Sequence, residues 1–144
     1  MAIKTITIQQ KFQAPISEVF GKLSDHEAFG KICGISMLRM KDGEDSANGL
    51  GSIRKISIGP LPSFEETITQ FAKDELIEYK ITKGSPIKNH VGRLNFSEQA
   101  GNTVLDYTIE LESKIPFTTS IIKKALENGI TKGLQNYAKT LLSN

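Results

Sequence analysis

Six polar side chains fall at strand positions whose neighbours on the same face are apolar. Every second residue of a strand faces the same side of its sheet, so alternation assigns the faces. A polar or charged group in a dry core is costly unless it has a partner, water or a ligand. These six are therefore the first candidates for chemistry: Gln10, Arg54, Glu66, Tyr79, His90 and Tyr107.

Arg54 and Glu66 form the strongest candidate pair, because they lie on consecutive predicted strands and could face each other. Inside an apolar pocket, the guanidinium could anchor a ligand oxygen. It could also polarise a carbonyl while Glu66 or His90 moves a proton. The same pair could instead be a structural ion pair at the rim of the sheet, with the arginine stem packed below it. His90 equally suits a hydrogen-bonded wall residue.

Apolar residues on the same faces predict the wall of a ligand cavity, namely Ile56, Ile68, Ile81 and Ile109. Two glycines, Gly129 and Gly133, lie four residues apart in a predicted C-terminal helix. Glycine inside a helix lowers helix stability by about 1 kcal/mol relative to alanine, so each of the two needs a structural or functional explanation. They could leave room for a ligand, let the helix bend, or allow close approach to a strand.

Several kinds of chemistry find no support in the sequence. The two histidines and the single cysteine are far apart, without zinc-ligand spacing. No glycine-rich phosphate loop or dinucleotide fingerprint is present, so we expect no metal and no cofactor. Cys33 is expected to be a small core residue, and His26, at a predicted helix start, is expected to be exposed.

The elements that must position these residues follow in a simple order. A first strand is followed by two short helices, six further strands and one long helix. Their predicted ranges are 6–12, 16–23, 26–33, 35–41, 50–58, 64–71, 76–82, 90–96, 104–111 and 117–141. Asp25 is expected to cap the second helix and Gly34 to end it. Short connections favour antiparallel pairing, because parallel strands need long crossovers.

Apolar residues recur at three- and four-residue steps along the last helix, from Ile121 to Leu141. We expect this stripe to lie on the sheet, since such a helix cannot stand alone. A sheet that curls around a helix tends to leave a pocket between them. The loops at 59–63 and 84–89 are predicted to form the lips of its entrance.

Composition limits the class of protein. The chain of 144 residues suits one domain over 1–144, and a net charge of +2 gives no reason to expect a nucleic-acid partner. The N-terminus alternates like a strand, and no window approaches the roughly 18 apolar residues of a membrane span. With one cysteine and no possible intrachain disulfide, we expect a cytoplasmic protein without integral membrane association. The oligomeric state is left open.

The chain resembles a known protein family along nearly its whole length. Its successive strands are similar to those of the polyketide cyclase/dehydrase-like branch of the START/Bet v 1 (SRPBCC) superfamily. The similar segments are GLGSIRKISIG, FEETITQF, LIEYKITKGSPIKNHVGRLNF and GNTVLDYTIEL. APISEVFGKLSDHEAFGKI resembles the family's first two helices. The resemblance implies an α+β helix-grip fold, in which a curved antiparallel sheet of about seven strands wraps around a long C-terminal helix.

Members of this superfamily include lipid carriers, cyclases, hydratases and chaperone-associated domains. The resemblance therefore implies binding of a small hydrophobic ligand (a lipid, isoprenoid or polyketide-like molecule) in a cavity between the sheet and the C-terminal helix. A cyclase/dehydratase-type enzyme using the same cavity is an alternative, so catalysis stays open. A protein-interaction domain of the chaperone-activator type is the third possibility, and it predicts an exposed apolar patch.

Overall fold

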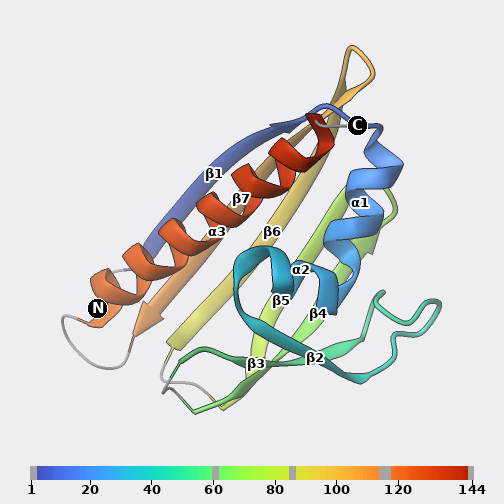
Figure 1. The fold of residues 1–144 in the computed structure, drawn as a ribbon. Helices are drawn as coiled ribbons and strands as arrows, with labels where there is room; N and C mark the ends of the chain where they lie inside the picture. Colours follow the sequence, from blue (N-terminus) through green and yellow to red (C-terminus); the bar gives the residue numbers. More distant parts are fainter. Residues whose placement is uncertain (1–2, 60–61, 85–86, 114–117, 143–144) are drawn as a thin grey trace.

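The computed structural model describes residues 3–59, 62–84, 87–113 and 118–142. Figure 1 shows one curved sheet with helices on its concave side. The elements are β1 (Lys4–Phe12), α1 (Ile16–Ser24), α2 (His26–Cys33), β2 (Ser36–Lys41), β3 (Ile53–Ser57), β4 (Phe64–Ala72), β5 (Leu76–Lys83), β6 (Ile87–Gln99), β7 (Asn102–Ser113) and α3 (Thr118–Leu142). This order matches the prediction.

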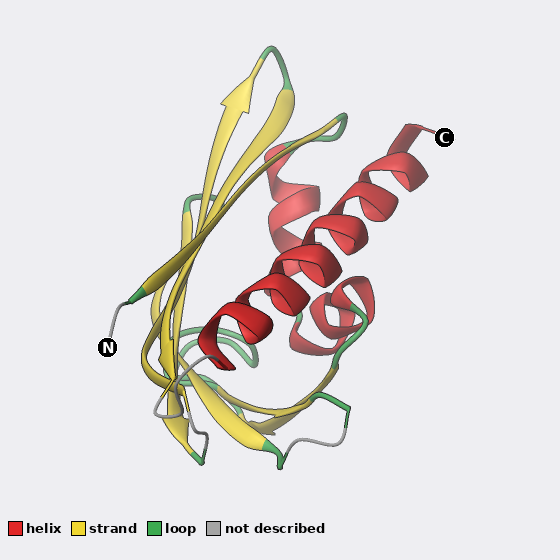
Figure 2. Cartoon of the chain, turned by 90° about the vertical axis from the view of Figure 1, so that its left-hand side faces the viewer, coloured by secondary structure: helices red, strands yellow, loops and turns green. Residues whose placement is uncertain are grey.

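The seven described strands form one antiparallel sheet in the order β1-β7-β6-β5-β4-β3-β2. The first strand closes on the last, with Ile6 opposite Ile109, and the remaining strands follow one another as hairpins. Figure 2, turned by 90°, shows the sheet on one side and the three helices on the other. The predicted helix-grip fold is confirmed.

Two local signals set the positions of the short helices. The carboxylate of Asp25 accepts a hydrogen bond from the backbone N–H of Ala28 at 3.0 Å, which caps α2. Gly34 ends that helix with a φ of 70°, a left-handed conformation that glycine adopts at little cost. Both signals confirm the sequence prediction, and together they fix where α2 meets the sheet.

The core lies between the concave face of the sheet and the helices. On β1 and β7 it includes Ile6, Phe12 and Leu105, all fully buried. The long helix α3 contributes with its C-terminal half, where Ile130 and Leu134 are buried. Ile121 is 71% exposed, so the prediction that the whole apolar stripe lies on the sheet is wrong. The helix contacts β1, β7 and α2, and its apolar side chains that pack in or against the core include Leu126, Ile130 and Leu134 but not Ile121.

The two glycines of α3 face the end of α2. A Cβ atom on Gly133 would overlap the carbonyl oxygen of Ile32, whereas one on Gly129 would meet the Cys33 oxygen at an ordinary 3.8 Å. The predicted close approach is therefore present at Gly133. Its partner, however, is a helix and not a strand, because α2 contacts both α3 and β2 and its last turn lies against Gly133.

Candidate functional site

A buried ion pair lies on the concave face of β3 and β4. Arg54 and Glu66 are directly opposite each other in the antiparallel ladder. The Arg54 Nε donates to Glu66 Oε1 at 2.9 Å, and the two residues are only 2% and 6% exposed. The pair that the sequence suggested is present, and it lies inside the fold and not at its rim.

Arg54 is held by further contacts around its guanidinium. Its Nη1 lies 3.4 Å from Nδ1 of His26. Its central carbon lies 4.5 Å from the ring centroid of Tyr79 and 5.5 Å from that of Phe29. Burial is the largest single influence and would lower the pKa of Arg54, but Glu66 together with Tyr79 and Tyr107 outweighs it, and the net shift is upward. The group is therefore a fixed cation with aromatic neighbours.

His26 is the residue that the sequence prediction placed wrongly. It is 1% exposed, and its Nε2 lies 2.9 Å from the hydroxyl oxygen of Ser52, which is fully buried. Burial, followed by the charge of Arg54, lowers the pKa of His26 from 6.5 to about 3. Because arginine only donates, Nδ1 must accept, and Nε2 carries the proton that it donates to Ser52.

A helical pattern could have located His26. It shares the buried face of α2 with Phe29, Gly30 and Cys33, at the three- and four-residue spacing of one helix side. Ser52 could have been found too, since alternation places it on the same face as Arg54 and Ile56. The prediction missed His26 because a polar residue beside a helix cap is usually solvated, and it missed Ser52 because serine is mostly exposed in folded proteins.

His90 and two tyrosines complete the polar cluster. The Nε2 of His90 lies 3.8 Å from the second oxygen of Glu66. Burial lowers the pKa of His90, and the opposing effect of Glu66 does not cancel it, so the imidazole is neutral. The hydroxyls of Tyr79 and Tyr107 hydrogen-bond to each other, and burial raises the pKa of both. Gly92 makes room for the Tyr79 ring, which a Cβ atom there would overlap.

Two nitrogen atoms of this cluster lack a hydrogen-bond partner within the described part of the chain. They are Nη2 of Arg54 and Nδ1 of His90, and both are buried. An unsatisfied buried polar group costs about 1 to 3 kcal/mol, so native proteins seldom keep one without a reason. The cluster as a whole can therefore offer a hydrogen bond to an additional group.

The other predicted site residues lie around the cluster or away from it. Ile56, Ile68 and Ile109 are buried on the same concave face, and Ile81 is partly exposed. Gln10 donates its amide to the backbone oxygen of Lys11 and takes no part in the network. The loops predicted as entrance lips include residues 60–61 and 85–86, which lie outside the described residues.

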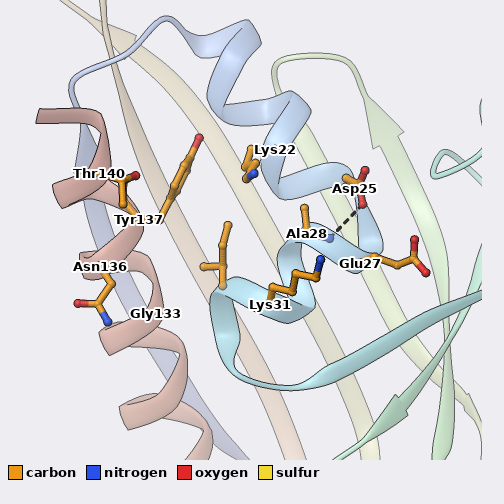
Figure 3. Close-up of a pocket in the computed structure, with 10 residues that line it drawn as sticks. Lys22, Asp25, Glu27, Ala28, Lys31, Gly133, Asn136, Tyr137 and Thr140 are labelled. Carbon is orange, nitrogen blue, oxygen red and sulfur yellow. Dashed lines mark hydrogen bonds between the residues drawn. The ribbon is translucent and has the colours of Figure 1, made fainter. Parts of the chain in front are cut away.

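A separate surface pocket of about 650 Å³ opens between α1, α2 and α3 (Figure 3). Of the predicted site residues, it includes Gly133 alone. Its lining is Lys22, Asp25, Glu27, Ala28, Lys31, Ile32, Gly133, Asn136, Tyr137 and Thr140. The lysines of this lining are matched by its acidic side chains, so the lining shows no preference for an anion or a cation.

Neutral buried histidines predict a pH-dependent stability. The pKa of His26 is about 3 in the folded chain and 6.5 in the reference state, so between these values the unfolded chain binds more protons. The free energy of unfolding must then fall as the pH falls, and the lowered pKa of His90 acts in the same direction. We expect the Tm to drop between about pH 7 and about pH 5. The variant His26→Gln, which keeps an acceptor and a donor, should show a shallower drop; an unchanged slope would contradict this.

No group of three or more His, Cys, Asp or Glu side chains that could hold a metal ion occurs among residues 3–59, 62–84, 87–113 and 118–142. Over the same residues, no helix has the length and apolar character needed to cross a membrane.

Comparison with known proteins gives one family and one shared fold. A family model described as polyketide cyclase/dehydrase and lipid transport matches residues 4–141. No curated protein matches the sequence.

Three solved structures illustrate the likeness of the fold. A START superfamily protein from Mycobacterium smegmatis has a TM-score of 0.77 at 16% identity, covering 95% of this chain and 98% of its own. A protein from Thermus thermophilus has a TM-score of 0.77 at 13% identity, covering 97% and 98%. Ara h 8.0201 has a TM-score of 0.67 at 16% identity, covering 99% and 100%.

Proposed function

The chain belongs to the polyketide cyclase/dehydrase and lipid transport family, and from that premise we propose that it binds a small hydrophobic molecule inside the fold, between the sheet and α3. Such a ligand is a lipid, an isoprenoid or a polyketide-like compound. Its apolar body lies against the concave face of the sheet, and its polar head lies at the buried cluster around Arg54.

One observation carries the proposal. Arg54 Nη2 and His90 Nδ1 are buried without a hydrogen-bond partner in the described residues. A ligand oxygen at Nη2 would accept a hydrogen bond from an N–H group that folding has already removed from water. Binding would therefore gain this hydrogen bond without a further desolvation cost at Arg54. The surroundings suit an apolar body, because Ile56, Ile68 and Ile109 share this face.

Exposed apolar side chains at the beginning of α3 also support a ligand between the sheet and this helix. Ile121 is 71% exposed and Leu126 is only partly buried. Ile81 on β5 is partly exposed as well. An apolar molecule beneath this part of the helix would remove such side chains from water, and each buried CH₂ group contributes about 0.8 kcal/mol. We propose that the ligand enters here.

The test compares the wild-type chain with the double variant Arg54→Met/Glu66→Leu, which removes both charges and keeps the core apolar. Each protein is incubated with a total lipid extract of the expression host, and native mass spectrometry then identifies what it carries. The wild type should hold a discrete mass that leaves on denaturation, and the double variant should lose it. A wild type without added mass, or a double variant that holds the same molecule, would contradict the proposal.

An enzyme of the cyclase/dehydratase type is the second candidate, favoured by the state of His90. Its neutral imidazole has a free Nδ1 near a fixed cation. There, Arg54 would polarise a carbonyl and His90 would accept a proton. The same mass spectrometry distinguishes the two, because an enzyme returns a bound molecule chemically changed and a carrier returns it intact.

We further propose that residues 1–144 form a single domain that works in the cytoplasm. The first and last strands are neighbours in one sheet, which supports cooperative unfolding. Burial raises the pKa of the free Cys33 thiol to about 12, which suits a structural thiol in a reducing compartment.

A further inference from the structure

We infer that the head group of the ligand is an uncharged oxygen, a carbonyl or a hydroxyl, and not a carboxylate. The inference rests on the proposed function, since it concerns the same buried cluster. It follows from which N–H groups of Arg54 the protein already uses.

A guanidinium has two edges that can grip a carboxylate at two points. One edge presents Nε together with Nη2, and the other presents Nη1 together with Nη2. In this protein Glu66 Oε1 occupies Nε at 2.9 Å, and His26 Nδ1 faces Nη1 at 3.4 Å. The Nε edge is therefore half occupied, one of the two N–H groups of Nη1 is directed at His26, and Nη2 is the guanidinium nitrogen without a partner among the described residues. At the Nε edge a carboxylate would gain one hydrogen bond where it needs two, and at the other edge its second oxygen would have to share Nη1 with His26.

The charge of the cluster gives the second argument. The Arg54 cation is already matched by the Glu66 anion, and the neighbouring groups His26, His90 and the two tyrosine hydroxyls are neutral. A carboxylate at Nη2 would bring a second anion next to Glu66 without a second cation. A buried charge without a counterion is costly. A neutral oxygen adds no charge and still satisfies the free N–H.

His26 and Ser52 are the residues that impose this selectivity. Ser52 is fully buried and holds the Nε2 side of the imidazole at 2.9 Å, so that Nδ1 stays directed at Arg54. Phe29, one turn further along α2, lies beside the guanidinium. The helix α2 thus positions a neutral acceptor against Nη1, and His26 acts as a positioning residue.

The experiment compares matched ligands by isothermal titration calorimetry at about pH 8, where the acids are ionised. The probes are decanol against decanoate and dodecanol against dodecanoate, so that only the head group differs. We expect each alcohol to bind at least about tenfold more tightly than its acid. Equal or tighter binding of the acids would overturn the inference and leave the proposed function standing. If neither alcohol nor acid binds, the proposed function fails, and the inference fails with it.

Two variants of His26 test the cause of the selectivity. His26→Leu removes the acceptor and frees Nη1, so the preference for the alcohol should shrink several-fold. His26→Gln keeps an acceptor for Nη1 and should retain the wild-type preference. The readout is the ratio of the two affinities, which a general loss of packing would not change. The role of His26 would be refuted if His26→Leu kept the wild-type ratio.

Discussion

Replacing Glu66 with leucine is expected to lower the free energy of unfolding by about 3 to 5 kcal/mol. The change leaves the Arg54 guanidinium buried without its counterion, since Glu66 Oε1 is its 2.9 Å partner. His26 cannot replace that partner, because a neutral imidazole compensates no charge. Chemical denaturation followed by circular dichroism measures the effect.

The double variant Arg54→Met/Glu66→Leu is the control for this prediction. Replacing a buried ion pair as a unit by apolar residues of similar volume is often neutral or stabilising. We therefore expect the double variant to regain most of the stability that Glu66→Leu loses. If the single and the double variants were equally unstable, the loss would come from side-chain packing, and the account of the ion pair would be wrong.

Alanine at Gly133 should destabilise the protein, and alanine at Gly129 should stabilise it. At Gly133 the new Cβ would overlap the Ile32 carbonyl oxygen, which is a backbone atom that cannot turn aside. Overpacking of this kind costs about 1 to 3 kcal/mol and would push α2 away from α3. At Gly129 the nearest atom is 3.8 Å away, so the gain in helix propensity of up to about 1 kcal/mol should be realised.

Thermal unfolding of the two alanine variants checks this pair of predictions. The comparison is internally controlled, because both glycines lie in the same helix and both substitutions add the same methyl group. A Tm that rises at Gly129 and falls at Gly133 is the expected result. Two shifts of the same sign would show that α2 and α3 do not meet as the structure describes.

The fold was predictable because its signals are local. Alternation along the strands, the cap at Asp25 and the left-handed Gly34 each depend on a few neighbouring residues. The long helix was predictable as a helix, but its packing was not. The exposure of Ile121 depends on where α3 lies against β1 and α2, and periodicity does not contain that information.

The site was predictable only where two strands determine it. Arg54 and Glu66 could be paired from the sequence, because consecutive antiparallel strands place their inward residues opposite each other. His26 reaches the same cluster from a helix, and its contact with Arg54 depends on how α2 docks on the sheet. For the same reason the free Nη2 of Arg54 could not be foreseen, since it depends on which nitrogens of the guanidinium the surrounding side chains contact in the folded protein.

The most direct test of the central claim is a titration of the labelled protein with decanol, followed by NMR of the side-chain nitrogens. The account predicts that the signals of Arg54 and His90 shift first and saturate together, because their free nitrogens mark the site. The surface pocket between α1, α2 and α3 serves as the internal control, through the backbone amide signals of Ala28 and Tyr137 recorded in the same titration. Shifts confined to that pocket, with Arg54 and His90 unchanged, would contradict binding inside the fold.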